Sequence, residues 1–148
     1  MKKILITGGF GKIATHFVQN FDHKYEITVA DIVTDNRTFN DNVRIEKADL
    51  MQFSDCTKLC EGIDTVIHLA GIVDPISDSD IILETNIKTT QNIFNAAVKA
   101  KCKRLIFASS AQTIESYPID IQVNKNMLVK PKNIYGVSKC FGEALAAY

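Results

Sequence analysis

The chain has 148 residues, 46% of them hydrophobic, and its 17 basic and 17 acidic side chains give a formal net charge of zero. This composition predicts one globular domain over residues 1–148 and argues against nucleic acid or an anionic membrane as a partner. The apolar run after Met1-Lys2-Lys3 is too short for a signal peptide or a membrane span, which predicts a cytoplasmic protein.

Short apolar, β-branched runs alternate along the chain with amphipathic stretches. The predicted strands are Lys3–Thr7, Glu26–Asp31, Val43–Lys47, Thr65–Leu69 and Arg104–Ser109. The predicted helices are Gly11–Phe21, Ser54–Cys60, Asp78–Lys101 and Asn133–Tyr148, and the long irregular stretches are 32–42 and 111–132. This alternation predicts an α/β fold, a doubly wound parallel sheet of the Rossmann type with strand order 3-2-1-4-5. Ligands of such sheets bind beyond the carboxyl ends of the strands, at the switch between strands one and four.

A glycine-rich turn, residues 7–14 (TGGFGKIA), joins the first predicted strand to the first predicted helix. Gly8 can adopt backbone angles that other residues avoid, and Gly9 and Gly11 allow a pyrophosphate to approach the backbone closely. The helix N-terminus offers unpaired N–H groups and the positive end of its dipole. The turn predicts a dinucleotide site contacted by Gly8, Gly9, Phe10, Gly11, Lys12 and Ile13; the alternative is a turn that binds no ligand.

Asp31 closes the second predicted strand, where a carboxylate would accept hydrogen bonds from both hydroxyls of an adenosine ribose. Its charge would repel a 2′-phosphate about 4 Å away by roughly 1 to 4 kcal/mol, which predicts NAD rather than NADP. Arg37, in the next loop, would weaken that discrimination. The alternative for Asp31 is an ordinary turn carboxylate at the end of a strand.

Further cofactor contacts are predicted after the third and fourth strands. They are Asp49 and Leu50, at the adenine, and Leu69, Ala70 and Gly71, at the ribose or nicotinamide. We interpret the neighbouring His68 as a hydrogen-bonded histidine at a strand end rather than as a general base.

Tyr135 and Lys139 are four residues apart and therefore share one face of a predicted helix. A free tyrosine has a pKa near 10, and an ammonium about 4 Å away can supply the roughly 4 kcal/mol that would make it a base near neutrality. Ser110, after the fifth strand, could hydrogen-bond the reacting oxygen. This set predicts hydride transfer from a substrate hydroxyl to a nicotinamide. The alternative is an ordinary amphipathic helix in which Tyr135 packs and Lys139 is solvated.

The four cysteines are Cys56, Cys60, Cys102 and Cys140. Their spacing does not match that of a metal or redox motif, so we expect free thiols and no metal.

Taken together, these motifs resemble the extended short-chain dehydrogenase/reductases, the NAD-dependent epimerase/dehydratase family. The resemblance runs along the whole chain and is carried by residues 7–13, 31, 49–50, 68–71, 86–90, 107–110 and 135–139. It implies an NAD-dependent enzyme acting on a sugar or nucleotide sugar. It implies that Tyr135 is the base, that Lys139 binds the nicotinamide ribose and lowers the tyrosine pKa, and that Ser110 is the catalytic serine. Asn86 would support a proton relay or the lysine.

Within this family, residues 109–118 and 135–145 are similar to uronate dehydrogenases, but Ala111-Gln112 stand where those enzymes usually have Asn-His. Family members continue past the Tyr-Lys helix with further strands and a C-terminal lobe that holds the sugar. We therefore expect the fifth strand to be an edge strand and the last helix to have an uncovered apolar side (Phe141, Leu145). We also expect a homodimer through helices 78–101 and 133–148, and weak or no turnover by this chain alone.

Three interpretations remain at this point. The first is an NAD-dependent sugar oxidoreductase, epimerase or dehydratase, and the second is specifically a uronate dehydrogenase. The third is a non-catalytic dinucleotide-binding fragment or sensor that keeps the same residues. An NADP-linked regulator or reductase is disfavoured by Asp31.

Overall fold

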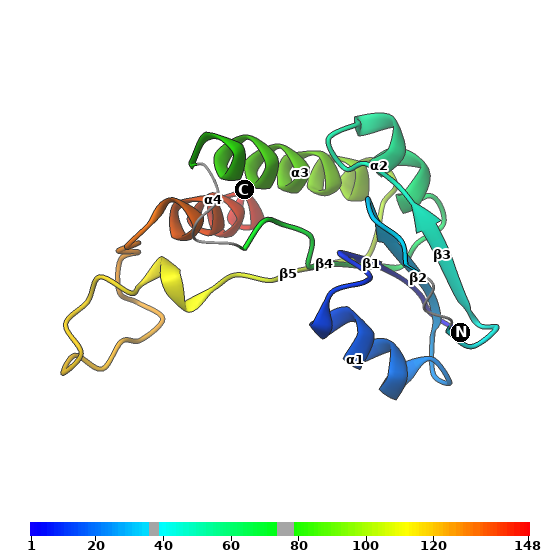
Figure 1. The fold of residues 1–148 in the computed structure, drawn as a ribbon, viewed down its shortest axis with the longest axis horizontal. Coiled ribbons are helices and arrows are strands. Elements are labelled where there is room, and N and C mark those ends of the chain that lie inside the picture. Colours follow the sequence, from blue (N-terminus) through cyan, green and yellow to red (C-terminus); the bar gives the residue numbers. More distant parts are fainter. Residues whose placement is uncertain (36–38, 74–78) are drawn as a thin grey trace.

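The computed structural model of the protein describes residues 1–35, 39–73 and 79–148 (Figure 1). In chain order its elements are β1 (Lys3–Thr7), α1 (Lys12–Phe21), β2 (Glu26–Asp31), β3 (Val43–Lys47), α2 (Phe53–Cys60), β4 (Thr65–His68), α3 (Ser79–Lys99), β5 (Arg104–Phe107), the 3-10 helix η1 (Ala111–Thr113) and α4 (Ile134–Ala147). Every predicted strand and helix is present, with ends that differ from the prediction by two residues at most. Asp78, the predicted first residue of the long helix, lies outside the described residues.

The five strands form one parallel sheet in the order β3-β2-β1-β4-β5, which confirms the predicted topology. The apolar β-branched runs occupy the centre of this sheet, where both faces are covered: Ile6 pairs with Val29 on one side and with Ile67 on the other. β5 is an edge strand of this sheet, as expected, and its Ile106 is 45% exposed.

Helices cover the two faces of the sheet unequally. α1 lies on one face, and α2, α3 and α4 lie on the other, with α3 packed between its two neighbours (Figure 1). The cluster on the α1 face contains Ile4, Ile6, Ala14, Val18, Ile27, Val29 and Ile67. The cluster on the opposite face is larger and includes Leu5, Leu50, Val66, Ile93, Phe94 and Ala97. Burial of these side chains is the main source of stability.

α4 sits closer to the sheet than the sequence predicts. Phe141 and Leu145 are half-buried, and Leu145 packs against the core, so the expected uncovered apolar side at these two residues is wrong. The reason is Gly142, which lies between them and is buried directly against the ring of Phe107. Because this position has no side chain, α4 packs closely against β5, and Phe141 and Leu145 are brought toward the sheet. The exposed large hydrophobic residue of α4 is instead Val137, at 42%.

Replacing Gly142 by alanine is expected to destabilise the fold by about 1–3 kcal/mol through overpacking. A Cβ at this position would lie 2.1 Å from Phe107 Cζ, and that ring is held by an edge contact with Phe94 at 5.9 Å between centroids. In an unconstrained helix the same change stabilises by roughly 1 kcal/mol. The sign of the change in unfolding free energy therefore shows whether Gly142 is packed against Phe107. Urea denaturation measures it, with Ala144→Gly on the exposed side of α4 as the matched control. Unchanged or increased stability of Gly142→Ala would contradict this packing.

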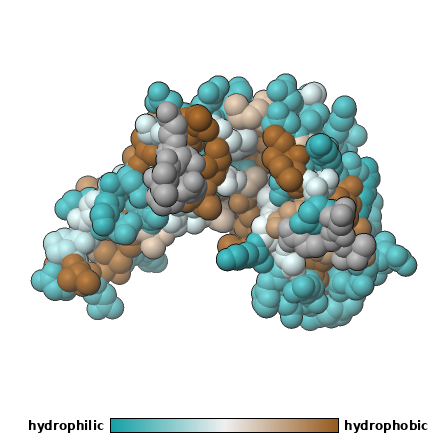
Figure 2. Space-filling view, in the orientation of Figure 1, coloured by the Kyte–Doolittle hydropathy of each residue, from teal (hydrophilic) through white to brown (hydrophobic). Residues whose placement is uncertain are grey.

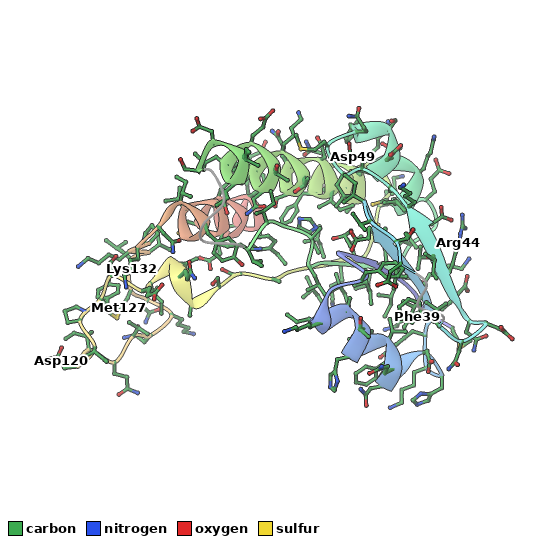
Figure 3. All side chains as sticks on the ribbon, viewed as in Figure 1. Phe39, Arg44, Asp49, Asp120, Met127 and Lys132 are labelled. Atoms are coloured by element: carbon green, nitrogen blue, oxygen red, sulfur yellow. The ribbon has the colours of Figure 1, made fainter. Side chains whose placement is uncertain are left out.

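The stretch 111–132, predicted to be irregular, begins with η1 and then forms a loop that projects from the body (Figure 1). Its two sides are joined by Lys130 N–H to Thr113 O at 2.7 Å and by Ser116 N–H to Lys130 O at 3.0 Å. Asp120 and Met127 mark its outer part in Figure 3. Figure 2 shows a hollow between this projection and the α1 side of the molecule. Among the described residues, no helix is long and apolar enough to cross a membrane.

Candidate dinucleotide and catalytic site

A cavity of about 930 Å³ lies beyond the carboxyl ends of the strands. Its volume falls within the range of small-molecule and cofactor sites. Ten of the residues predicted to contact a cofactor line it: Gly8, Gly11, Lys12, Ile13, Asp31, Asp49, Leu50, Leu69, Ala70 and Gly71. These residues follow four different strands, and the topology brings them to one edge of the sheet.

The glycine turn is built on close backbone contacts. Gly8 has φ +69° and approaches the loop after β4 so closely that a Cβ would lie 2.8 Å from Ala70 N. Gly11 N–H donates to Gly8 O at 3.0 Å and closes the turn before α1. Gly9 faces β2 instead of the cavity, since its Cβ would lie 2.6 Å from Val29 Cβ. Gly9 therefore has to be small so that the turn can pack against β2. The glycine pattern alone does not distinguish this packing requirement from the close approach of a ligand.

Asp31 is held at the rim of the cavity by two backbone N–H groups. Phe10 N–H donates to its Oδ2 at 3.1 Å, and Val33 N–H donates to its Oδ1 at 3.3 Å. The ring of Phe10 packs against Phe39 at 5.9 Å between centroids, so Phe10 fixes the carboxylate rather than lining the cavity. Arg37, which was expected to weaken the discrimination, lies outside the described residues.

The other side of the cavity is held by α3, on which the sequence predicted Asn86 as a site residue but neither Asn92 nor the residues that line the cavity. Asn92 donates from Nδ2 to Leu50 O at 2.8 Å and to Met51 O at 3.0 Å, fixing the loop after β3. Asp49 Oδ1 accepts from Met51 N–H at 2.9 Å, and Figure 3 shows Asp49 beside the start of α2. Further lining residues include Ala48, Met51, Ile72, Val73, Thr85 and Thr89. The spacing of Thr85 and Thr89, four residues apart on α3, is the sequence signal that could have found them.

His68 is fully buried between two hydroxyls, which confirms the interpretation of a hydrogen-bonded histidine. Its Nδ1 lies 2.7 Å from Thr7 Oγ1, and its Nε2 lies 3.2 Å from Thr90 Oγ1. Burial, with the positive charge of Lys139 as a second cause, lowers the pKa of His68 from 6.5 to about 3. The ring is therefore neutral at physiological pH and joins β1, β4 and α3.

This burial makes stability depend on pH in a predictable direction. Between pH 3 and 6.5 the unfolded chain binds a proton at His68 that the folded chain excludes, so stability falls as the pH is lowered through that window. We expect urea titrations at several pH values to show a steeper loss in the wild type than in His68→Gln, by at most about 1.4 kcal/mol per pH unit. His16→Gln, exposed on α1, is the control that keeps the steep loss. Equal slopes in the wild type and His68→Gln would contradict a neutral buried ring.

The predicted catalytic side chains meet between β5 and α4. Ser110 caps η1, its hydroxyl acts on the pKa of Tyr135, and Lys139 is 5% exposed. Lys139 Nζ lies 4.9 Å from the ring centroid of Phe107 and 5.5 Å from that of Tyr135. It also lies near Gly71, a residue that lines the cavity, where a Cβ would be 3.8 Å from Nζ.

The expected lowering of the tyrosine pKa by the lysine is not what this arrangement gives. Burial raises the pKa of Tyr135 above its usual value, and the hydrogen bond from Ser110 opposes that rise. Burial also lowers the pKa of Lys139, because an ammonium between two rings loses its hydration. The spacing of the two residues predicted their proximity, but it could not show that the ammonium lies over the rings.

Asn86 links α3 to both the cavity and α4. Its Oδ1 accepts from Ile72 N–H at 2.7 Å, and its Nδ2 donates to Ile72 O at 3.0 Å and to Ser138 Oγ at 3.2 Å. The Ser138 hydroxyl in turn donates to Tyr135 O at 2.7 Å. Asn86 therefore holds the loop after β4 against the helix that carries Tyr135. This geometry favours support of the site over direct proton transfer.

Comparison with known proteins gives relatives along the whole chain. The model of the NAD dependent epimerase/dehydratase family matches residues 4–148. Uronate dehydrogenase of Agrobacterium fabrum is 31% identical, over 99% of this chain and 55% of the relative. The bifunctional UDP-glucose 4-epimerase and UDP-xylose 4-epimerase 1 of Pisum sativum is 29% identical, over 98% of this chain and 47% of the relative.

A solved structure shares the fold and holds a cofactor. It is a tyrosine-to-alanine mutant of uronate dehydrogenase from Agrobacterium tumefaciens complexed with NAD, with a TM-score of 0.88 and 31% identity over 99% of this chain and 55% of that one. The chain spans about half the length of these relatives. Because the family model matches nearly every residue and the sheet has the predicted order, the chain belongs to the NAD-dependent epimerase/dehydratase family.

Proposed function

We propose that this chain is the NAD-binding and catalytic part of an enzyme that oxidises a sugar or nucleotide sugar. The observation that carries the proposal is the continuity of one cavity, which runs from Asp31, past the glycine turn, to Gly71 beside Lys139. Asp31, Asp49 and Leu50 would hold the adenosine end of NAD, and the N-terminus of α1, with Lys12, would face the pyrophosphate. Ala70 and Gly71 would leave room for the nicotinamide ribose beside the catalytic side chains.

The proposed chemistry is removal of a hydride and a proton from one carbinol of the sugar. NAD, when bound, accepts the hydride. Tyr135 would take the hydroxyl proton as general base, and Ser110 would donate a hydrogen bond to the same oxygen. Burial raises the pKa of Tyr135, and the hydrogen bond with Ser110 opposes that rise and so favours the tyrosinate that the step requires. Asn86 would hold the loop after β4 in a fixed position relative to α4.

Uronate dehydrogenase is the finer candidate. It is supported by the 31% identity and by the similarity of residues 109–118 and 135–145. Against it stands Gln112, whose Oε1 accepts a hydrogen bond from Asn133 and so has a partner within the chain. A non-catalytic dinucleotide-binding fragment is the second candidate function, and it is favoured because the described residues that line the cavity do not include Ser110, Tyr135 or Lys139. The cytoplasmic location, the homodimer and the weak turnover of this chain alone stay predictions.

The decisive experiment is NADH formation under single-turnover conditions, with concentrated chain, NAD and a panel of uronates, aldoses and UDP-sugars. We expect NADH to form with one sugar class, and Tyr135→Phe to slow it by about a hundredfold or more, the usual contribution of a general base. Tyr148→Phe, fully exposed at the end of the chain, is the matched control. NAD binding without NADH from any sugar would favour the non-catalytic alternative. Equal rates in Tyr135→Phe and wild type would overturn the role of Tyr135.

A further inference from the structure

Two amide side chains outside the predicted catalytic set join the turn of Ser110 to the helix of Tyr135. Asn133 is the N-cap of α4, and its Oδ1 accepts from Gly136 N–H at 2.8 Å. Its Nδ2 donates to Gln112 Oε1 at 2.6 Å. Because the cap requires the oxygen of Asn133, the amide nitrogen is left to face η1, and Gln112 has to present its own oxygen.

Backbone contacts also join η1 to the start of α4, and we call this contact region the η1–α4 junction. A Cβ at Gly136 would lie 2.4 Å from Gln112 O, so the first turn of α4 rests on the main chain of η1. On the other side, Gln112 N–H donates to Ser110 Oγ at 3.2 Å, and Thr113 Oγ1 donates to Ser110 O at 2.8 Å. Gln112 therefore contacts α4 through its side chain and its carbonyl, and Ser110 through its N–H.

This junction positions the Ser110 hydroxyl. Gln112 N–H donates to one lone pair of Ser110 Oγ at 3.2 Å, and the Ser110 proton remains available for donation to Tyr135. Donation in this sense stabilises a tyrosinate, which agrees with the lowering effect of Ser110 on the pKa of Tyr135. Lys139, over the ring at 5.5 Å, is a charged group that faces Tyr135 from its own helix.

We propose that Gln112 and Asn133 are positioning residues, whose side-chain hydrogen bond holds the Ser110 turn against α4 and keeps the serine hydroxyl donating to Tyr135. The inference rests on the roles proposed above for Ser110 and Tyr135. It concerns the chain before any cofactor or substrate binds, so it can be tested separately from NAD binding and turnover.

Two variants remove this hydrogen bond and leave the neighbouring functions in place. Asn133→Ser keeps an oxygen for the helix cap but loses the amide donor, and Gln112→Met keeps the length of the side chain but loses the acceptor. Neither side chain is buried, so the fold is expected to persist. Gln122→Met, exposed on the projecting loop, is the matched control. Ser110→Ala gives the largest effect that loss of the serine hydroxyl can produce.

The readout is the pKa of Tyr135, measured by fluorine NMR on chain labelled with fluorotyrosine, whose more acidic phenol titrates under milder conditions. The chain has four tyrosines, and Tyr135→Phe identifies the signal. We expect each single variant to raise the pKa of Tyr135 by up to about one unit, the size of one hydrogen bond to an ionised group, without exceeding Ser110→Ala. The double variant should show no more than the larger single effect, because both changes remove one interaction.

Three outcomes would overturn the proposal. The first is an unchanged pKa in Gln112→Met and Asn133→Ser when Ser110→Ala raises it. The second is a double variant equal to the sum of the singles, which indicates two independent structural effects. The third is an unchanged pKa in Ser110→Ala, which shows that the serine does not donate to Tyr135. NAD affinity, measured on the same variants, tests the cofactor site independently of all three.

Discussion

Gly8→Ala is expected to abolish detectable NAD binding and to destabilise the fold by several kcal/mol. Two costs add at this position. The φ of +69° costs an alanine about 1–2 kcal/mol, and its Cβ would lie 2.8 Å from Ala70 N and 2.9 Å from Ala70 Cα. These neighbours are backbone atoms between β4 and the cavity, so relief requires displacing the loop that closes the proposed nicotinamide end.

Gly62→Ala is the matched control for Gly8→Ala. Gly62 has nearly the same φ, +70°, but a Cβ there would meet nothing within 4 Å. It therefore reports the conformational cost alone, and NAD binding should be unaffected. Urea denaturation and NAD calorimetry on both variants make the comparison. Equal losses of stability in the two variants, or full NAD affinity in Gly8→Ala, would contradict a turn packed directly against the β4 loop.

Asp31→Asn is expected to change cofactor preference more than any other single charge change in the site. Removing the carboxylate charge takes away the repulsion of a 2′-phosphate, roughly 1 to 4 kcal/mol at about 4 Å, so the ratio of NADP to NAD affinity should rise about tenfold to a thousandfold. NAD affinity itself should fall, because a neutral amide is the weaker acceptor for ribose hydroxyls.

The control for Asp31→Asn is Asp49→Asn, which lies on the same cavity but was assigned to the adenine. It should weaken NAD and NADP alike and leave their ratio unchanged. Calorimetric titrations of the wild type and both variants with each cofactor give the three ratios required. A preference for NAD that survives Asp31→Asn would assign the discrimination to another group.

The fold was predictable because its signals are local and repeated. Each central strand is a short apolar run, as at Ile4–Ile6, and each carboxyl end carries small or polar residues that a parallel sheet gathers at one edge. The cofactor side of the candidate site followed from this rule alone. Asp31 and Gly71 are 40 positions apart in sequence numbering, yet both line one cavity.

The parts that sequence reasoning missed depend on packing distances. Phe141 is covered because Gly142 packs directly against the ring of Phe107. The spacing of apolar residues in the sequence does not predict this contact. The pKa of Tyr135 is set by burial and by its hydrogen bond with Ser110, whereas the spacing to Lys139 shows only that the two share a helix face. Asn92 was missed because an asparagine within a helix gives no sign that it supports a loop residue, Leu50, that lies 42 positions earlier.

Calorimetric titration of this chain with NAD, and with NADP in parallel, tests the central claim most directly. The account predicts micromolar binding of NAD and much weaker binding of NADP, because the glycine turn, the anchored Asp31 carboxylate and the cavity that reaches Gly71 are all present in this chain. Absence of binding for both cofactors, or tighter binding of NADP, would contradict it.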